Sequence, residues 1–113
     1  MEHRTVNSQF PNFDNLETFN KILSAVREHN FRDVSWKNDA MPCIQSELSH
    51  GFQLVIWVDY KDAKLAEFTD ERESGEMKQL MFGERDEDGE YAEQWQYDDA
   101  DALIAHVYKV MTA

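Results

Sequence analysis

The first residue to examine for chemistry is Cys43, the only cysteine of the chain, which lies in the stretch WKNDAMPCI from Trp36 to Ile44. A nucleophilic cysteine reacts as a thiolate, and it needs a histidine or another positive group close by to lower the pKa of its thiol. His50 follows Cys43 by seven residues, and the other three histidines lie far away in the sequence. Because no spacing indicates a base beside the thiol, we do not expect cysteine catalysis.

The same stretch has the residue types of a corner between two strands. Asn38 and Asp39 can hydrogen-bond to their own backbone in a turn, and Pro42 cannot donate to a strand ladder. We therefore predict a structural corner, with Trp36 and Ile44 packing into the core from its two sides. An exposed Asp39 would also be able to contact a partner.

Metal binding is the second chemistry to consider, because the run ERDEDGEY, residues 84–91, contains an Asp-x-Asp-Gly sequence. Placing Gly89 at the sixth position of a calcium loop puts Trp95 at the twelfth, where a bidentate Glu is required. The Asp-Gly pair instead predicts a β-hairpin turn. Cysteine and histidine spacings of the zinc type and a glycine-rich phosphate loop are also missing from the sequence. We expect no metal and no cofactor.

Acidic residues are the remaining candidates for function. The formal net charge is −12, and residues 67–101 hold 14 acidic and 3 basic residues, whereas residues 1–66 hold 9 acidic and 7 basic residues. Such a field opposes direct binding to nucleic acid or an anionic membrane and favours a basic protein partner. A surface that only aids solubility is the alternative. The candidate partner-binding residues are Glu84, Asp86, Glu87, Asp88, Glu90, Glu93, Asp99, Asp101 and Asp39.

Three aromatic residues, Tyr91, Trp95 and Tyr97, are interleaved with these acids. Strand alternation places all three on one face of an extended segment, where side chains repeat at roughly 6.6 Å. They can serve as apolar anchors at an interface, or they can pack in the core beneath a helix. The sequence leaves both interpretations open and favours the core.

Helical spacing predicts two helices. Residues 1–12 lack periodicity and are predicted to form a loose N-terminal arm, after which Asp14 and Glu17 have the spacing of a capping box. The apolar stripe of the first helix predicts a buried face, and Asn30 is a plausible left-handed cap. Asp98 is predicted to cap the final helix. The residues predicted to be buried include Leu16, Phe19, Ile22, Val26, Leu54, Ile56, Val58, Leu103, Ile104 and Val107.

The segments between the two helices have the patterns of strands. FRDVSW, CIQSEL and FQLVIWVDY are predicted strands, and the last of these has apolar residues on both faces, as a central strand does. LAEFTDE (residues 65–71), MKQLMFGE and YAEQWQY are further extended segments. We predict an α+β fold, an antiparallel meander of five or six strands flanked by an N-terminal and a C-terminal helix, in a single domain over residues 13–113.

The N-terminus and the longest apolar run of the chain bear on its cellular location. The N-terminus has no apolar segment of the signal-peptide type, and the longest apolar run, LVIWV, is too short to cross a bilayer. We expect a cytoplasmic protein with no membrane partner.

The run ERDEDGEYAEQWQYDDAD, Glu84 to Asp101, in a short chain without a catalytic motif, resembles the small acidic accessory proteins of phages and mobile elements, including anti-CRISPR and anti-restriction proteins. The resemblance implies a non-enzymatic inhibitor that binds the basic nucleic-acid-binding site of a CRISPR or restriction complex and excludes the nucleic acid. The alternatives are an immunity-type protein that caps a basic toxin, and a small ligand-binding or enzymatic α+β domain with a pocket between sheet and helices.

Overall fold

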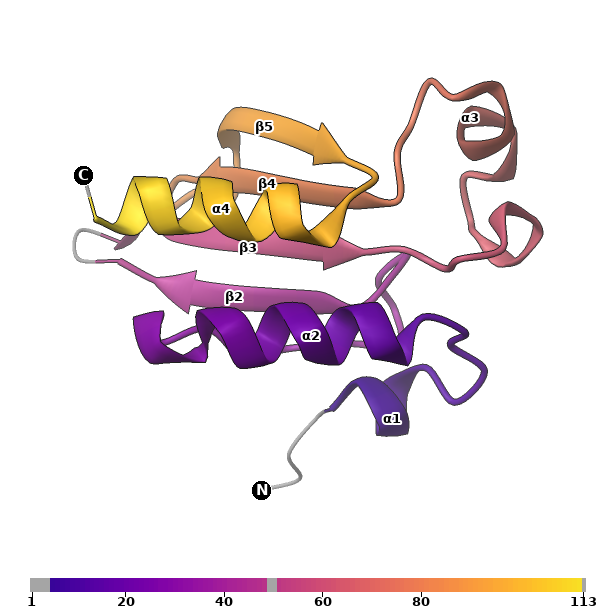
Figure 1. Cartoon of the computed structure of the whole chain (residues 1–113), viewed down its shortest axis with the longest axis horizontal. Coiled ribbons are helices and arrows are strands. Elements are labelled where there is room, and N and C mark those ends of the chain that lie inside the picture. Colours follow the sequence, from indigo (N-terminus) through magenta and orange to yellow (C-terminus); the bar gives the residue numbers. More distant parts are fainter. Residues whose placement is uncertain (1–4, 49–50, 113) are drawn as a thin grey trace.

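The computed structural model of the chain describes residues 5–48 and 51–112, so the predicted turn at residues 49–51 lies largely outside the described residues. Within them, the centre of the molecule is a five-stranded antiparallel sheet with its strands in sequence order (Figure 1). This is the predicted meander, with five strands. The strands are β1 (Arg32–Asp33), β2 (Cys43–Glu47), β3 (Gln53–Val58), β4 (Leu80–Arg85) and β5 (Tyr91–Tyr97).

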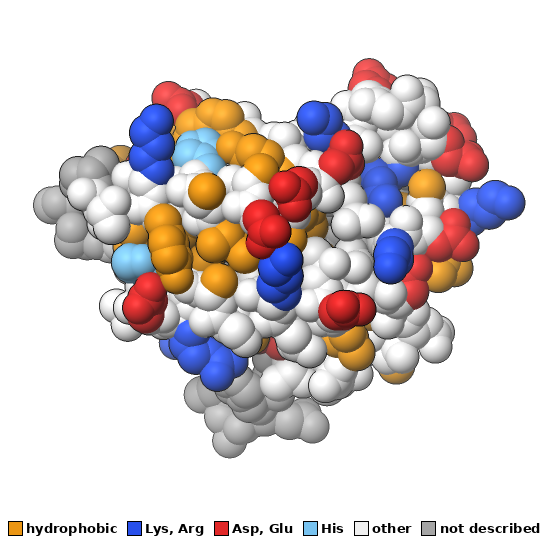
Figure 2. All heavy atoms as spheres, viewed as in Figure 1, with side chains coloured by type: hydrophobic (Ala, Val, Ile, Leu, Met, Phe, Trp, Pro, Cys, Tyr) orange, Lys and Arg blue, Asp and Glu red, His pale blue; other side chains and the backbone are white. Residues whose placement is uncertain are grey.

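Two helices, α2 (Leu16–Val26) and α4 (Ala100–Met111), lie side by side across one face of the sheet (Figure 1). Both are amphipathic, and their apolar stripes meet alternate residues of the strands in one continuous core. The space-filling view of this side shows hydrophobic side chains gathered along the seam between α2 and α4 (Figure 2). The predicted burial is confirmed for all ten residues except Leu16 and Ile104, which are half-buried.

Strand β3 is the interior strand that its sequence predicts. It pairs with β2 on one side and with β4 on the other. Leu54, Ile56 and Val58 belong to the core beneath the helices, while Val55 is fully buried on the opposite face. No helix of the described residues lies across that second face of the sheet, which we call the helix-free face (Figure 1).

The prediction of a loose arm over residues 1–12 is wrong for its described part. Helix α1 (Val6–Gln9) is capped by Thr5, and Val6 and Phe10 are buried in the core. The segment is tied to distant residues, because the Val6 amide donates to Asp33 at 2.7 Å and the Lys37 amide donates to Gln9 at 3.0 Å.

The predicted Asp14 capping box is also wrong. Helix α2 is preceded by Asn15, which makes no side-chain cap, and Asp14 instead accepts hydrogen bonds from the amides of Lys61 and Asp62 at 2.7 and 2.9 Å. The Asn15 side chain donates to the carbonyl of Asp59 at 3.1 Å. These two residues therefore hold the end of β3 against the start of α2. Asn30 does adopt the predicted left-handed conformation, with φ of 66°.

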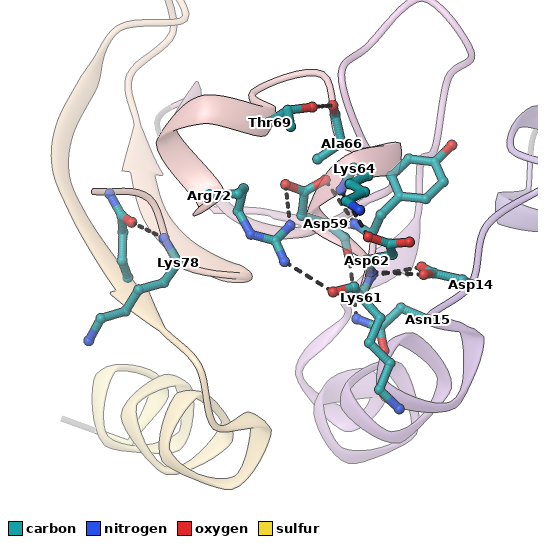
Figure 3. A network of polar contacts seen from close by, with 12 residues as sticks. Asp14, Asn15, Asp59, Lys61, Asp62, Lys64, Ala66, Thr69, Arg72 and Lys78 are labelled. Atoms are coloured by element: carbon teal, nitrogen blue, oxygen red, sulfur yellow. Dashed lines mark hydrogen bonds and ion pairs between the residues drawn. The ribbon is translucent and has the colours of Figure 1, made fainter. Parts of the chain in front are cut away.

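The stretch from residue 59 to residue 79, which we call the β3–β4 excursion, contains no strand. The segment 65–71, predicted as extended, instead holds parts of the short helices η3 (Ala63–Leu65) and α3 (Thr69–Ser74). Its centre is an ion pair in which Arg72 donates to Asp59 at 2.7 Å, with side-chain exposures of 7% and 0% (Figure 3). Burying two charges is stabilising only when each has its partner, so this pair fixes the excursion to the sheet.

The corner predicted in the stretch from Trp36 to Ile44 is confirmed as a structural element, and it occupies residues 34–42, because β1 ends at Asp33 and β2 begins at Cys43. The Asp39 amide donates to the carbonyl of Trp36 at 2.9 Å, and the carbonyl of Pro42 accepts from Val58 at 3.1 Å. Ile44 is fully buried, as predicted, but Trp36 is 41% exposed, so only one of the two expected side chains packs into the core.

No helix in the described part of the chain is long and apolar enough to cross a membrane.

Candidate functional site

The acidic hairpin between β4 and β5, residues 86–90, is organised by one of its own acids. The Asp86 carboxylate accepts hydrogen bonds from the amides of Asp88 and Glu90, both at 2.9 Å, and Gly89 has φ of 85°, a conformation that favours glycine. The predicted Asp-Gly turn is therefore confirmed. Asp86 stabilises this turn, which leaves Glu87, Asp88 and Glu90 as its exposed carboxylates.

Two further predicted site residues lie next to this hairpin. Glu84 and Glu93 are directly paired across β4 and β5, where like charges repel each other. A side chain built on Gly51 would meet Glu87 at 3.1 Å, which shows that Gly51 adjoins the hairpin. Six of the nine predicted residues therefore gather at one end of the sheet.

The other three predicted residues lie at the opposite end. Strand β5 runs away from the hairpin, so the start of α4 is a full strand length from it (Figure 1). There Asp99, not the predicted Asp98, is the N-cap of α4, since its carboxylate accepts from the amide of Asp101 at 3.1 Å. Asp101 pairs with Lys21 at 2.9 Å, and this hydrogen bond raises the pKa of the Lys21 ammonium.

Asp39 lies in the corner before β2, at that same second end of the sheet. The predicted residues thus divide into an acidic hairpin group and three separate carboxylates. Of these three, Asp99 is engaged by the backbone of its own helix and Asp101 by a lysine.

The basic residues within the acidic third of the chain are partly turned inward. Arg72 is held by the buried carboxylate of Asp59. Arg85 lies across the face of the sheet without helices, where its guanidinium donates to Gln53 at 3.0 and 2.8 Å and to Gln45 at 2.9 Å. Two of the three bases in residues 67–101 are thus used for internal contacts: the charge of Arg72 is matched by Asp59, whereas the hydrogen-bond partners of Arg85 are uncharged.

Tyr91 lies on the opposite face from the one predicted. The register shifts between Glu84 and Arg85, so that Glu84 pairs with Glu93 but Arg85 pairs with Tyr91. This irregularity places Tyr91 on the helix-free face, where its hydroxyl accepts a hydrogen bond from the Trp57 indole at 2.7 Å.

Trp95 and Tyr97 remain on the helix side, as the core interpretation predicts. Trp95 packs against Phe82 and His106 with ring centroids 5.5 and 4.4 Å apart. The Tyr97 hydroxyl bonds to His106 of α4. These two aromatic residues therefore belong to the packing beneath α4 and are not anchors of an acidic interface.

A pocket on the helix-free face was not predicted from the sequence. It has a volume of about 250 Å³ and is lined mainly by methionine and aromatic side chains. Trp57 and Met81 are neighbours across β3 and β4, and the corner and the β3–β4 excursion form the walls. The alternation of β3 did indicate an apolar surface on the second face of the sheet, since Val55 and Trp57 are apolar residues on that face. The lining residues are Asp39, Ala40, Met41, Trp57, Phe68, Met77, Met81 and Tyr91.

Cys43 is buried at the start of β2, and its thiol contacts the carbonyl of Ile44 at 3.9 Å. Burial raises the pKa of the Cys43 thiol far above its ordinary value of 9.0. Since the thiolate is the reactive form, Cys43 in this environment is a packing residue and a poor nucleophile. Across residues 5–48 and 51–112, no group of three or more histidine, cysteine or carboxylate side chains is arranged to hold a metal ion.

Comparison of the chain with models of protein families, with curated proteins and with solved structures finds no match.

Proposed function

We propose that this protein is a non-enzymatic inhibitor that binds the basic nucleic-acid-binding site of another protein and excludes the nucleic acid from it. The partner we propose is a CRISPR or restriction complex, and the place of action is the cytoplasm of the host cell. The partner class comes from the resemblance in character to small acidic accessory proteins, and the mode of binding comes from the arrangement of charge.

The observation that carries the proposal is a contrast within residues 67–101. Three acids of the hairpin are exposed to solvent, whereas two of the three bases make contacts inside the protein. Glu87, Asp88 and Glu90 are exposed on a turn that Asp86 stabilises by two hydrogen bonds, while Arg72 and Arg85 make their contacts with the protein itself. Closely spaced carboxylates on a rigid turn can occupy positions at which a basic site holds phosphates. A complementary field of this kind speeds association and sets its dependence on salt.

The test begins with capture from host lysate. The immobilised protein is exposed to lysate with and without nuclease treatment, and retained proteins are identified. We expect a nucleic-acid-binding protein that is retained after nuclease treatment and is released by added duplex DNA or RNA. A partner that is a basic toxin would favour the immunity-type alternative, and a partner whose binding is indifferent to nucleic acid would contradict the exclusion mechanism.

A charge-matched pair of variants localises the contact. One combines Glu87→Gln, Asp88→Asn and Glu90→Gln, and the control combines Glu17→Gln, Glu28→Gln and Asp98→Asn, all exposed acids outside the hairpin. We expect the hairpin variant to bind the captured partner more slowly and with a weaker dependence on salt than the control. Equal binding by both variants at low and high salt would show that the hairpin acids only aid solubility.

A further inference from the structure

The pocket on the helix-free face, which we call the open-face pocket, is built by segments far apart in the sequence. Met41 comes from the corner before β2, and Phe68 and Met77 flank α3 in the β3–β4 excursion. Trp57, Met81 and Tyr91 form its base on the sheet. We propose that this pocket receives one apolar side chain from a basic segment of a protein partner.

Exposed apolar side chains are frequent in the two segments that form the walls of this pocket. Five large hydrophobic residues in the described part of the chain are markedly exposed, and three of them, Trp36, Leu65 and Phe68, lie in the corner and the β3–β4 excursion. These two segments leave the sheet at the same end, because β2 begins where β3 ends. Scattered exposed apolar residues are ordinary, but Phe68 is both exposed and part of the pocket lining, and an exposed apolar side chain at the rim of a pocket is typical of an interaction site.

The size and lining of the pocket favour a side chain over a larger ligand. Its volume of about 250 Å³ lies below the roughly 300–1,000 Å³ of pockets that bind drug-sized molecules. Methionine side chains are flexible and adapt to the shape of an inserted group. The aromatic base is more rigid, since the Trp57 indole donates to Tyr91 at 2.7 Å and Arg85 lies 5.9 Å from the centre of the Tyr91 ring.

The charge beside the pocket selects a basic partner. Between the lining residues Phe68 and Met77, and at the residue before Phe68, the chain carries five acids: Glu67, Asp70, Glu71, Glu73 and Glu76. The whole β3–β4 excursion holds seven acids and four bases, of which Lys61, Lys64 and Lys78 are exposed, while Arg72 is turned inward to Asp59 with a side-chain exposure of 7%. Lysine or arginine residues flanking an apolar anchor would therefore meet carboxylates as the anchor enters the pocket. This inference rests on the proposed function for the basic character of the partner.

The experiment uses methionine methyl groups as reporters of the pocket. The full-length protein is labelled with ¹³C-methyl methionine and titrated with a ten-residue Lys/Arg peptide that carries one central Phe, and with the same peptide carrying Ala instead. We expect the methyl signals of Met41, Met77 and Met81 to shift, while Met111 on α4 stays in place. The Ala peptide should bind at least about tenfold more weakly, as the loss of one buried anchor implies.

The chain offers a closely matched control for the pocket wall. Phe68 is 40% exposed and lines the pocket, whereas Phe52 is 39% exposed and lies at the other end of β3. Phe68→Ala should weaken binding of the Phe peptide at least about tenfold, and Phe52→Ala should leave it unchanged. Because both side chains are partly in solvent, neither substitution should unfold the protein.

Three results would overturn the proposal: no methyl shift at millimolar peptide, equal affinity for the Phe and Ala peptides, or equal binding by the two phenylalanine variants. Each would show that any binding is by charge alone. These results are separate from the capture test. A captured nucleic-acid-binding partner that still binds the Phe68→Ala variant would uphold the proposed function and contradict the role of the pocket. Binding of the Phe peptide in the NMR titration, with no nucleic-acid-binding partner captured, would uphold the pocket and contradict the proposed function.

Discussion

The two faces of the sheet bury apolar side chains by different means. On the helix side, Ile56 and Phe82 are covered by α2 and α4 and belong to one continuous core. On the helix-free face, which we also call the open face, Val55 is equally buried, and side chains of neighbouring strands contact one another there. Tyr91 lies across Gly83 there, and Arg85 bridges to Gln45 and Gln53.

This difference suggests a division of roles, in which the helix side provides stability and the open face provides a surface for recognition. On the helix side, apolar packing beneath α2 and α4 forms one continuous core. The open face is held by hydrogen bonds, among them the one from Trp57 to Tyr91, and by an ion pair at its end, and it retains a pocket there. Polar cross-links of this kind position an exposed apolar surface without covering it.

The largest expected effect concerns the ion pair that holds the wall of the open face. Arg72→Ala leaves the fully buried carboxylate of Asp59 without its partner, and we expect unfolding to become easier by about 3–5 kcal/mol. Replacing both residues with leucine should recover much of this loss, because no unpaired charge remains. Urea denaturation of the single and double variants measures both values, and a single variant as stable as the wild type would show that the pair does not hold the excursion.

The second effect compares packing on the two faces directly. Ile56→Ala on the helix side should cost about 2–5 kcal/mol, since it opens a cavity in a closed core. Met81→Ala on the open face should cost only about 1 kcal/mol, because Met81 already borders a pocket. Equal losses in denaturant titrations would mean that the open face is packed as tightly as the core.

A smaller effect tests the aromatic cover of the open face. A methyl group added at Gly83 would lie 2.9 Å from two carbons of the Tyr91 ring and 3.2 Å from the carbonyl oxygen of Glu93. Gly83→Ala should therefore push the ring away from Trp57 and cost about 1–3 kcal/mol through overpacking. Stability is read from denaturation and the ring displacement from Tyr91–Trp57 contacts in NMR spectra. An unchanged contact in the variant would contradict the position of Tyr91.

The sequence predicted the features that depend on local pattern. The stripe of α2, the alternation of β3 and the Asp-Gly hairpin each follow from the spacing of a few neighbouring residues, and all three are confirmed. The candidate acids of the hairpin could be identified for the same reason, because an exposed turn needs polar residues and a glycine.

The errors arise where distant segments decide the local structure. Asp14 has the spacing of a helix cap, but the amides of Lys61 and Asp62 compete for its carboxylate. The face of Tyr91 depends on a one-residue register shift that pattern alone does not reveal. The open-face pocket joins Met41, Phe68 and Met81, and no local signal connects residues so far apart. Helix α1 is too short for a periodic pattern, and its burial depends on contacts with Asp33 and Lys37.

The smallest expected effect concerns Cys43, which is buried on the open-face side and is used by neither proposal. Its thiol is neutral in the folded protein, because burial raises its pKa, while the unfolded chain ionises near the ordinary value of 9.0. Folding stability should therefore be unaffected below that pH and fall as the pH rises above it, by up to about 1.4 kcal/mol per unit. The measurement is the difference in unfolding free energy between the wild type and Cys43→Ala from pH 7 to pH 10, which cancels the titration of lysines and tyrosines. At pH 7 the folded protein should also resist alkylation by iodoacetamide. Rapid alkylation, or a difference that does not change with pH, would show that the thiol is accessible and would return Cys43 to the candidates for chemistry.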